Sequence, residues 1–346
     1  MEDEKIIHDR MITNISDDYD KSKGNFVYDI TKPVAVEFAK QQEKIAAVQE
    51  KLDVEKLTGD ELTRTVYQRT GVSRKPATQA TTTVIVSGTA GTLVKVGELV
   101  GTETILYTVI EEAILNESGF AHVRVQCNEF GQIGNVPANT IVNFPASING
   151  LVNVYNPDPV VDGYEEETDN DLRQRYYDKL QRPGKAGNKY HYREWALEVT
   201  GVGDAKIFPR YNGPLSMKVV VIDANKLPAN VELIEAVRDH IEEEMPFGVD
   251  DLLIISAEAL LIDLSVALSL MPGYKEEVVK ANIKKNITKH LKEIAFRTSF
   301  VSYAKIGALI IESDGVLDYQ DLLINGSTAN VVIPDDGVPV MGGVNE

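Results

Sequence analysis

Hydrophobic and polar residues alternate in three short stretches of the first half of the chain, a spacing typical of half-buried β-strands. The stretches cover residues 83–86, 105–109 and 122–127. They lead into a turn in which Gly131 and Gly134 are expected to adopt backbone angles that other residues resist, and Asn135 follows in the same turn. The pattern predicts a small β-domain over residues 81–155 whose closing turn has a structural role.

Residues 1–80 are predicted to be mostly helical and to dock onto a partner. One helix carries a narrow apolar seam among charged residues, at spacings of seven, three and four: Phe38, Ile45, Val48 and Leu52. Such a seam suits a partner helix better than a broad core. Packing of the seam against the chain's own β-domain is an alternative that the sequence leaves open. Pro33 is expected in the first turn of this helix, where proline is tolerated.

The second half of the chain alternates between strand and helix patterns. Residues 156–216 are predicted as a helical linker region, and residues 217–346 as an α+β domain that carries self-association. Its strands between residues 252 and 270 are more apolar than one covering layer of helices needs. Apolar residues four apart mark a long helix whose other face is rich in lysine: Val279, Ile283, Ile287 and Leu291. The predicted fold class is therefore α+β and multi-domain, with N-terminal helices, a small β-domain and a C-terminal α+β domain whose strands pack on helices.

The charge of the chain narrows the choice of partners. With 53 acidic and 35 basic side chains among 346 residues, the formal net charge is −18. Such a chain repels nucleic acids and anionic membrane surfaces, so neither is expected as a partner. The acidic amino terminus shows no signal peptide, and no apolar run is long enough to span a membrane. We therefore expect assembly in the cytoplasm.

The single cysteine and the acidic segment 162–171 are the first candidates for chemistry. Cys127 alternates with Val123 and Val125, which predicts a small buried side chain, and a lone cysteine excludes an internal disulfide. Paired carboxylates can hydrolyse glycosides, but those of the acidic segment crowd the start of one helix, where they favour the positive end of its dipole. Thr168 and Asp171 have the spacing of a capping box. The segment is therefore expected to be a solvated helix cap.

Other residues give no positive sign of an enzyme, a metal or a cofactor. A calcium loop starting at Asp169 fails because Arg173 and Gln174 stand where a ligand and a glycine belong. The five histidines are scattered without a metal-binding pair, and no Gly-x-Ser-x-Gly motif occurs. Basic residues gather between positions 182 and 193, where we expect contact with an acidic protein surface instead of nucleic acid.

Four stretches have an order and spacing that carry a family resemblance. They lie at residues 14–29, 71–78, 131–141 and 165–203, the last with the pair Trp195-Ala196. Their succession resembles the baseplate J-like family, the wedge proteins of contractile phage tails and related tail-like particles. Together the stretches cover residues 14–215. Two places depart from the family: Gly213-Pro214-Leu215 lacks a second glycine, and Asn139 replaces a usual glycine.

The resemblance implies a structural function without catalysis. Members of this family form paired copies within a wedge, joined by a smaller wedge protein, and wedges close into a six-fold ring around the tail hub and beneath the sheath. On host attachment the ring rearranges and triggers sheath contraction. The implied partners are other copies of the chain, the smaller wedge protein, and the tail hub and sheath-proximal proteins, within a virion or tail-like particle. A cell-wall hydrolase and a carbohydrate-binding adhesin of a tail are the competing classes, and only the β-domain favours the adhesin.

Overall fold

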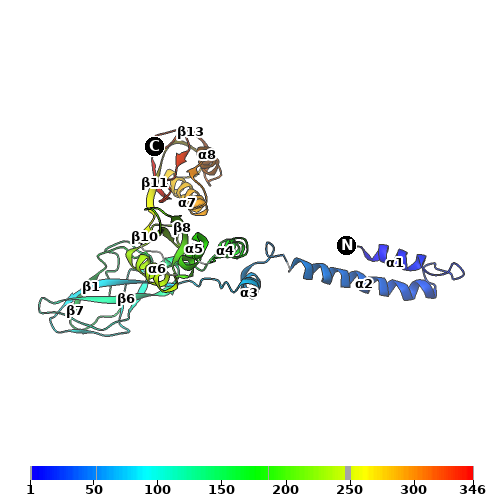
Figure 1. Ribbon diagram of the computed structural model, residues 1–346, viewed down its shortest axis with the longest axis horizontal. Coiled ribbons are helices and arrows are strands. Elements are labelled where there is room, and N and C mark those ends of the chain that lie inside the picture. Colours follow the sequence, from blue (N-terminus) through cyan, green and yellow to red (C-terminus); the bar gives the residue numbers. More distant parts are fainter. Residues whose placement is uncertain (1, 52, 186, 246–250, 346) are drawn as a thin grey trace. The chain divides into compact units, whose positions relative to one another are not determined.

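The computed structural model describes residues 2–51, 53–185, 187–245 and 251–345. Helices and strands alternate along these residues, so the predicted α+β multi-domain class is confirmed (Figure 1). The chain divides into two compact units. The first comprises Met1–Arg74 and Thr168–Leu180, and the second comprises Lys75–Glu167 and Gln181–Glu346. No helix of the described residues is long and apolar enough to cross a membrane.

The first unit begins with a helical hairpin of α1 (Glu4–Thr13) and α2 (Phe26–Glu50). The Asp3 side chain caps α1 by accepting a hydrogen bond of 2.8 Å from the backbone N–H of Ile6. Helix α2 starts at Phe26, so the expectation that Pro33 occupies its first turn is wrong: Pro33 lies inside the helix. Asn25 takes the N-cap position, and the helix extends seven residues upstream of the proline.

Two further helices complete the first unit, α3 (Gly59–Thr70) and α4 (Asp169–Gln181). Gly71 ends α3 in the left-handed conformation, with φ 74°, as glycine commonly does after a helix. The helices and the loop before α3 enclose a small core of buried residues: Val54, Leu57, Leu62, Val66, Leu172 and Tyr176. The segment from 168 to 180 therefore belongs with the N-terminal helices, although more than ninety residues separate it from them in sequence.

The second unit opens with a nearly closed, barrel-like antiparallel sheet whose strand order is β3-β4-β6-β1-β7. Alternate residues of β1 and β6 point inward, and Cys127 is fully buried among them, as predicted. The strands are β1 (Gln79–Gly88), β2 (Leu93–Val94), β3 (Leu99–Gly101), β4 (Leu106–Val109), β5 (Ala113–Ile114), β6 (Phe120–Phe130) and β7 (Leu151–Tyr155). The predicted turn follows β6 and contains a short 3-10 helix, Gln132–Gly134.

A three-stranded sheet with order β10-β9-β8 follows the barrel. Helices α5 (Lys189–Glu198) and α6 (Val231–Glu244) share a buried core with this sheet. The strands are β8 (Val202–Pro209), β9 (Ser216–Asp223) and β10 (Asp251–Ser256), with β10 parallel to β9. β8 and β9 pair antiparallel, so the predicted domain boundary between residues 216 and 217 falls inside this sheet.

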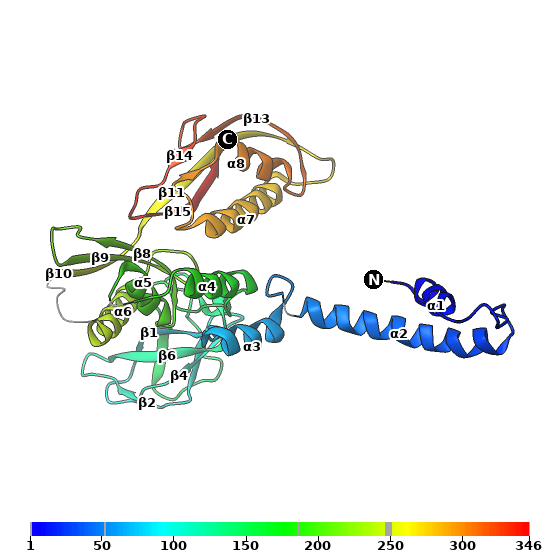
Figure 2. The same ribbon diagram turned by 45° about the vertical axis from the view of Figure 1, so that its right-hand side comes forward.

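The last part of the chain forms a second sheet covered by helices, shown in Figure 2. Its sheet has the order β13-β11-β15, with β11 and β15 parallel, and α7 and α8 pack on one face. The helices are α7 (Glu276–Ile294) and α8 (Tyr303–Ile311). The strands are β11 (Glu258–Leu270), β12 (Phe300–Val301), β13 (Val316–Ile324), β14 (Val331–Val332) and β15 (Gly337–Asn345).

Candidate functional site: the apolar stripe, the closing turn and the acidic segment

The predicted seam lies on an exposed face of α2. Phe38, Ile45 and Val48 are 56%, 59% and 59% exposed, and Leu52 lies outside the described residues. The same face continues toward the start of the helix through exposed Phe26, Ile30 and Val34. We call the set the apolar stripe: Phe26, Ile30, Val34, Phe38, Ile45 and Val48. At about 100° of turn per residue, the six side chains fall within a sector of about 120°.

Helix α1 covers a different face of α2. Ala35 of α2 is fully buried, and Thr31 Oγ1 lies 3.0 Å from Nε2 of His8 on α1. The side chain of Gln42 accepts a hydrogen bond of 3.2 Å from the backbone N–H of Glu2, and His8 makes an edge contact with Tyr28. The hairpin therefore satisfies the polar and small-residue side of α2 and leaves the apolar stripe uncovered in the single chain.

The turn after β6 needs its two glycines for different reasons. Gly131 has φ +91°, and its neighbour Gln132 donates a backbone hydrogen bond of 2.8 Å to the Glu165 carboxylate. Gly134 lies outside the left-handed region, so the expectation of an unusual backbone angle is wrong for Gly134. A Cβ at Gly134 would stand 2.7 Å from the Cβ of Ala80 and 2.9 Å from that of Cys127. Gly134 is required because β1 and β6 leave no space for a side chain.

Asn135 and Gln132 join this turn to two other segments of the second unit. Asn135 exchanges two hydrogen bonds with the backbone of Gly163: its Nδ2 donates at 2.9 Å, and its Oδ1 accepts at 2.8 Å. Gln132 Nε2 donates at 2.5 Å to Asn225 Oδ1, and the buried Asn225 donates at 3.2 Å to Gly163 O. The closing turn is thus a polar joint between the barrel and the loop that follows β9.

The acidic segment, residues 162–171, makes specific contacts with distant parts of the chain. The expectation that it is only a solvated helix cap is therefore wrong. In the second unit, Asp162 accepts hydrogen bonds from the backbone N–H and the hydroxyl of Thr81, at 2.8 and 2.5 Å. Glu167 accepts from the backbone N–H of Lys75 at 3.2 Å and donates its own N–H to Lys75 O at 3.0 Å. With the contact between Glu165 and Gln132, three carboxylates of the segment bind backbone donors of the barrel or of the chain just before it.

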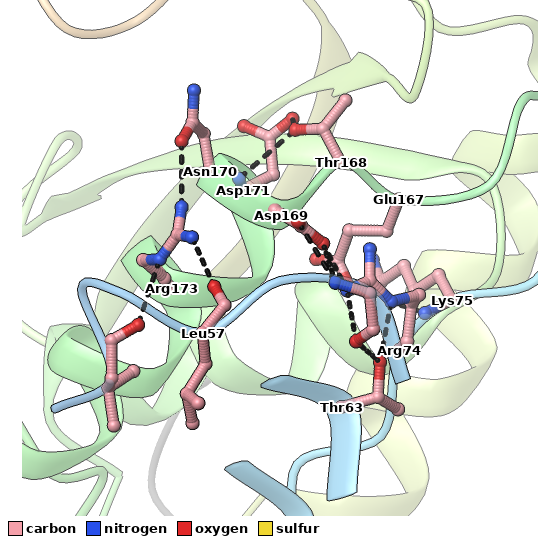
Figure 3. A network of polar contacts seen from close by, with 12 residues as sticks. Leu57, Thr63, Arg74, Lys75, Glu167, Thr168, Asp169, Asn170, Asp171 and Arg173 are labelled. Carbon is pink, nitrogen blue, oxygen red and sulfur yellow. Dashed lines mark hydrogen bonds and ion pairs between the residues drawn. The ribbon is translucent and has the colours of Figure 1, made fainter. Parts of the chain in front are cut away.

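In the first unit, the continuation of the acidic segment fastens α4 to α3 (Figure 3). Asp169 forms an ion pair of 2.5 Å with Arg74 and accepts a hydrogen bond of 3.1 Å from the backbone N–H of Gly59. Arg74 also donates at 2.8 Å to Thr63 Oγ1. Burial alone would raise the pKa of the Asp169 carboxyl, but hydrogen bonds from Arg74 and Gly59 outweigh it and hold this pKa below its usual value.

Two further sets of hydrogen bonds hold the start of α4. Thr168 and Asp171 form the predicted capping box, since the backbone N–H of Asp171 donates to Thr168 Oγ1 at 3.2 Å. Arg173 donates to two backbone carbonyls of the loop before α3, Val54 O at 3.1 Å and Leu57 O at 2.6 Å, as Figure 3 shows for Leu57. The spacing of the sequence revealed the capping box but could not reveal partners more than a hundred residues away.

Two buried titratable groups lie apart from these contacts. Burial raises the pKa of the Cys127 thiol, which disfavours the reactive thiolate. Asp223, at the end of β9, is 4% exposed and accepts a hydrogen bond of 2.8 Å from the backbone N–H of Leu227. Burial raises the pKa of Asp223 to about 7. Within the described residues, no three His, Cys, Asp or Glu side chains gather closely enough to hold a metal ion.

Comparisons with known proteins agree along most of the chain. Residues 83–163 match the baseplate J-like protein barrel domain, residues 184–255 the baseplate J-like central domain, and residues 262–345 the baseplate J-like protein C-terminal domain. The chain is similar to the phage-like element PBSX protein XkdT of Bacillus subtilis (strain 168), with 30% identity over 354 residues, 98% of this chain and 96% of that protein.

Two other similarities are more distant. The chain is 26% identical over 171 residues to baseplate protein gp47 of Escherichia phage Mu, which covers 47% of this chain and 48% of that protein. Among solved structures, a chain of the six-fold symmetrised cryo-electron-microscopy baseplate of the anti-feeding prophage aligns with 98% of this chain, and 97% of its own length is covered. The identity is 11% and the TM-score is 0.43.

Proposed function

Because this chain belongs to the baseplate J-like family and is a baseplate protein of a phage tail or tail-like particle, we propose that it serves there as a structural wedge component. In this role it makes contacts and transmits movement, and it carries out no catalysis. The family resemblance supports paired copies within a wedge, joined by a smaller wedge protein. Wedges then close into a six-fold ring around the tail hub and beneath the sheath, after assembly in the host cytoplasm.

The observation that carries this proposal is the uncovered apolar stripe of α2. Three of its residues, Phe38, Ile45 and Val48, are each more than half exposed, although α1 already covers another face of the same helix. Fully burying an aliphatic or aromatic side chain contributes roughly 1.5–3 kcal/mol, so a partner helix on this stripe gains substantial free energy. A helix that packs against one neighbour and keeps an apolar stripe exposed on another side is typical of a member of a helical bundle. We assign the apolar stripe to the smaller wedge protein.

The acidic segment supports a mechanical role. The chain passes between its two units at residues 74/75, 167/168 and 180/181. On the first unit's side, Arg74 is paired with Asp169, and on the second unit's side Lys75 and Glu167 exchange two hydrogen bonds. Both ends of the first two passages are therefore fixed within their own unit. A ring that rearranges to trigger sheath contraction needs such fixed attachments, because a loose connection would absorb the movement.

The test is a pair of charge substitutions in the apolar stripe. Ile45→Asp combined with Val48→Asp should abolish wedge assembly while the chain stays folded, because burying an unpaired carboxylate in a helix interface is costly. Ala46→Asp combined with Ala47→Asp is the matched control, since it adds the same charge to the same region of α2 at positions about 60° or more outside the sector of the stripe. Each variant is co-expressed with the neighbouring tail genes, and assembly is followed by co-purification and electron microscopy. Normal particles from the stripe variant would refute the assignment.

A further inference from the structure

Helices α6 and α7 each carry a stripe of a single charge with the same spacing. On α6, carboxylates follow one another at intervals of four and three residues: Glu235, Asp239 and Glu242. On α7, lysines follow at the same intervals: Lys285, Lys289 and Lys292. At about 100° of turn per residue, each set falls within a sector of about 60°. We call these sets the carboxylate stripe and the lysine stripe.

Both stripes lie opposite the buried faces of their helices. Helix α6 buries Leu233, Val237 and Ile241, whereas all members of the carboxylate stripe are exposed. Helix α7 buries four apolar residues four apart, whereas Lys285 and Lys289 are exposed and Lys292 is half-buried. Each stripe rises about 10 Å along its helix, since a helix advances about 1.5 Å per residue. The stripes therefore match in length and spacing and are opposite in charge.

Neither stripe is explained by the stability of its own helix. Glu235 and Asp239 stand four residues apart, as do Lys285 and Lys289, and like charges at this spacing destabilise a helix. The start of α7 shows the stabilising arrangement, in which Glu276 pairs with Lys280 four residues later. Within the described part of the chain, no ion pair is formed by Glu235, Asp239, Lys285 or Lys289. A partner of opposite charge would relieve the repulsion in both helices.

We propose that the lysine stripe of α7 docks onto the carboxylate stripe of α6 in a second copy of this chain. The inference rests on the proposed function, in which copies associate within the baseplate, and it names the two surfaces that meet. A contact between two different surfaces is heterologous, and such contacts close into rings when the rotation between copies allows it. The chain has a net charge of −18, so complementary stripes also select the orientation in which two acidic copies approach.

Charge reversal tests the proposal in the full-length chain. Lys285→Glu with Lys289→Glu, and separately Glu235→Lys with Asp239→Lys, should each weaken self-association at least about tenfold at low salt in sedimentation equilibrium. The four substitutions combined in one chain should restore the association, because the stripes are again complementary. Glu111→Lys with Glu112→Lys is the matched control for the carboxylate stripe, since it makes the same charge change as Glu235→Lys with Asp239→Lys. Both control positions are exposed on the barrel, so association should be unchanged.

Cross-linking tests the same contact if the affinity is low. One preparation carries Asp239→Cys and the other Lys285→Cys, and mild oxidation of the mixture should give a disulfide-linked dimer. Cys127 is fully buried and should not react. A mixture of the Glu111→Cys and Lys285→Cys chains is the control and should give no such dimer. The inference would be overturned if the specific dimer did not form and if charge reversal left self-association unchanged.

The two proposals fail in different experiments. If reversal of either stripe leaves association unchanged while the substitutions in the apolar stripe of α2 still block assembly, the pairing of α6 with α7 is wrong and the wedge function stands. Duplex DNA is the alternative partner for the lysine stripe. Binding of the wild-type chain to a duplex oligonucleotide, lost in the variant with Lys285→Glu and Lys289→Glu, would assign the stripe to nucleic acid and overturn the inference.

Discussion

Among the described residues, seven residues other than glycine have a positive φ, and two of them lie in the stretches where the sequence departs from the family resemblance. Asn139 has φ 59° and Leu215 has φ 60°. Asparagine tolerates this conformation, whereas a larger side chain pays a steric cost of about 1–2 kcal/mol. Leu215 is therefore expected to be the more strained of the two residues.

Leu215→Gly should accordingly stabilise the chain. Leu215 is 55% exposed, so its removal sacrifices little buried area, while glycine adopts φ 60° without strain. The expected gain in the free energy of unfolding is about 0.5–1 kcal/mol after the entropic cost of glycine. Urea unfolding of the wild type and the variant measures it. Asn139→Gly serves as the comparison and should change stability less; a loss of stability in Leu215→Gly would show that the leucine side chain makes a contact worth more than the strain.

Gly134→Val should lower the melting temperature of the barrel through crowding. Overpacking a well-filled core typically costs about 1–3 kcal/mol. Ala80→Gly combined with Gly134→Ala should recover part of the loss seen for Gly134→Ala alone, because the closest obstacle is the Ala80 Cβ at 2.7 Å. Thermal unfolding of the variants measures this. No recovery would show that Cys127, whose Cβ would stand 2.9 Å from the new Cβ, is the main obstacle.

Asp223 should make stability depend on pH. Its pKa is about 7 in the folded chain and near its ordinary value of 3.8 when unfolded, so the folded state binds more protons between these values. Stability from this group is therefore complete below about pH 4 and is lost as the pH rises through about 7, with a total change of roughly 2–4 kcal/mol. Urea unfolding at pH 5 and pH 8 should show a larger decrease for the wild type than for Asp223→Asn. Equal decreases would mean that Asp223 is not the titrating group.

At the scale of elements, local patterns were sufficient for most helices and strands but not for their partners. The four-residue spacing of α7 and the alternation of β6 appear directly in the sequence, and both elements form as predicted. The sequence predicts a solvated acidic segment because the partners of this segment, such as Thr81 and Lys75, lie more than eighty residues away. The start of α2 is predicted too late because proline favours the first turn of a helix, whereas Pro33 lies inside this helix. Neither a long-range hydrogen bond nor a proline tolerated inside a helix leaves a periodic signal in the sequence.

The same long-range contacts predict how α4 is held. Arg173→Met should destabilise the first unit by about 1–3 kcal/mol, because the carbonyls of Val54 and Leu57 lose their donor. Arg173→Lys should recover only part of this stability, since an ammonium group lacks the planar fork that reaches two carbonyls at once. The measurement is thermal unfolding of the full chain. Equal stability of Arg173→Lys and the wild type would show that charge alone suffices.

At the scale of the whole molecule, the association of copies stays a prediction. We expect the isolated chain to be a monomer or a weak dimer and to form multimers only with its wedge partners, because contacts that close a ring work best when each is weak. Light scattering of the full chain and of a chain ending at residue 256 tests this; the end point keeps β8, β9 and β10 together. A stable dimer of the shortened chain would move the association surface out of residues 257–346.

The pairing of β11 with β15 has a consequence for the order of events during synthesis. Glu258 pairs with Gly337, and Ser265 with Asn345, so the first strand of this domain waits for a strand that is translated about eighty residues later. Domains fold as units as they emerge from the ribosome, and N-terminal ones fold first. The barrel can therefore be complete while this sheet still lacks an edge. A polypeptide released before β15 is made would expose one unpaired edge of β11 and be open to degradation. Only fully translated copies would then present a finished α7 surface to a growing ring.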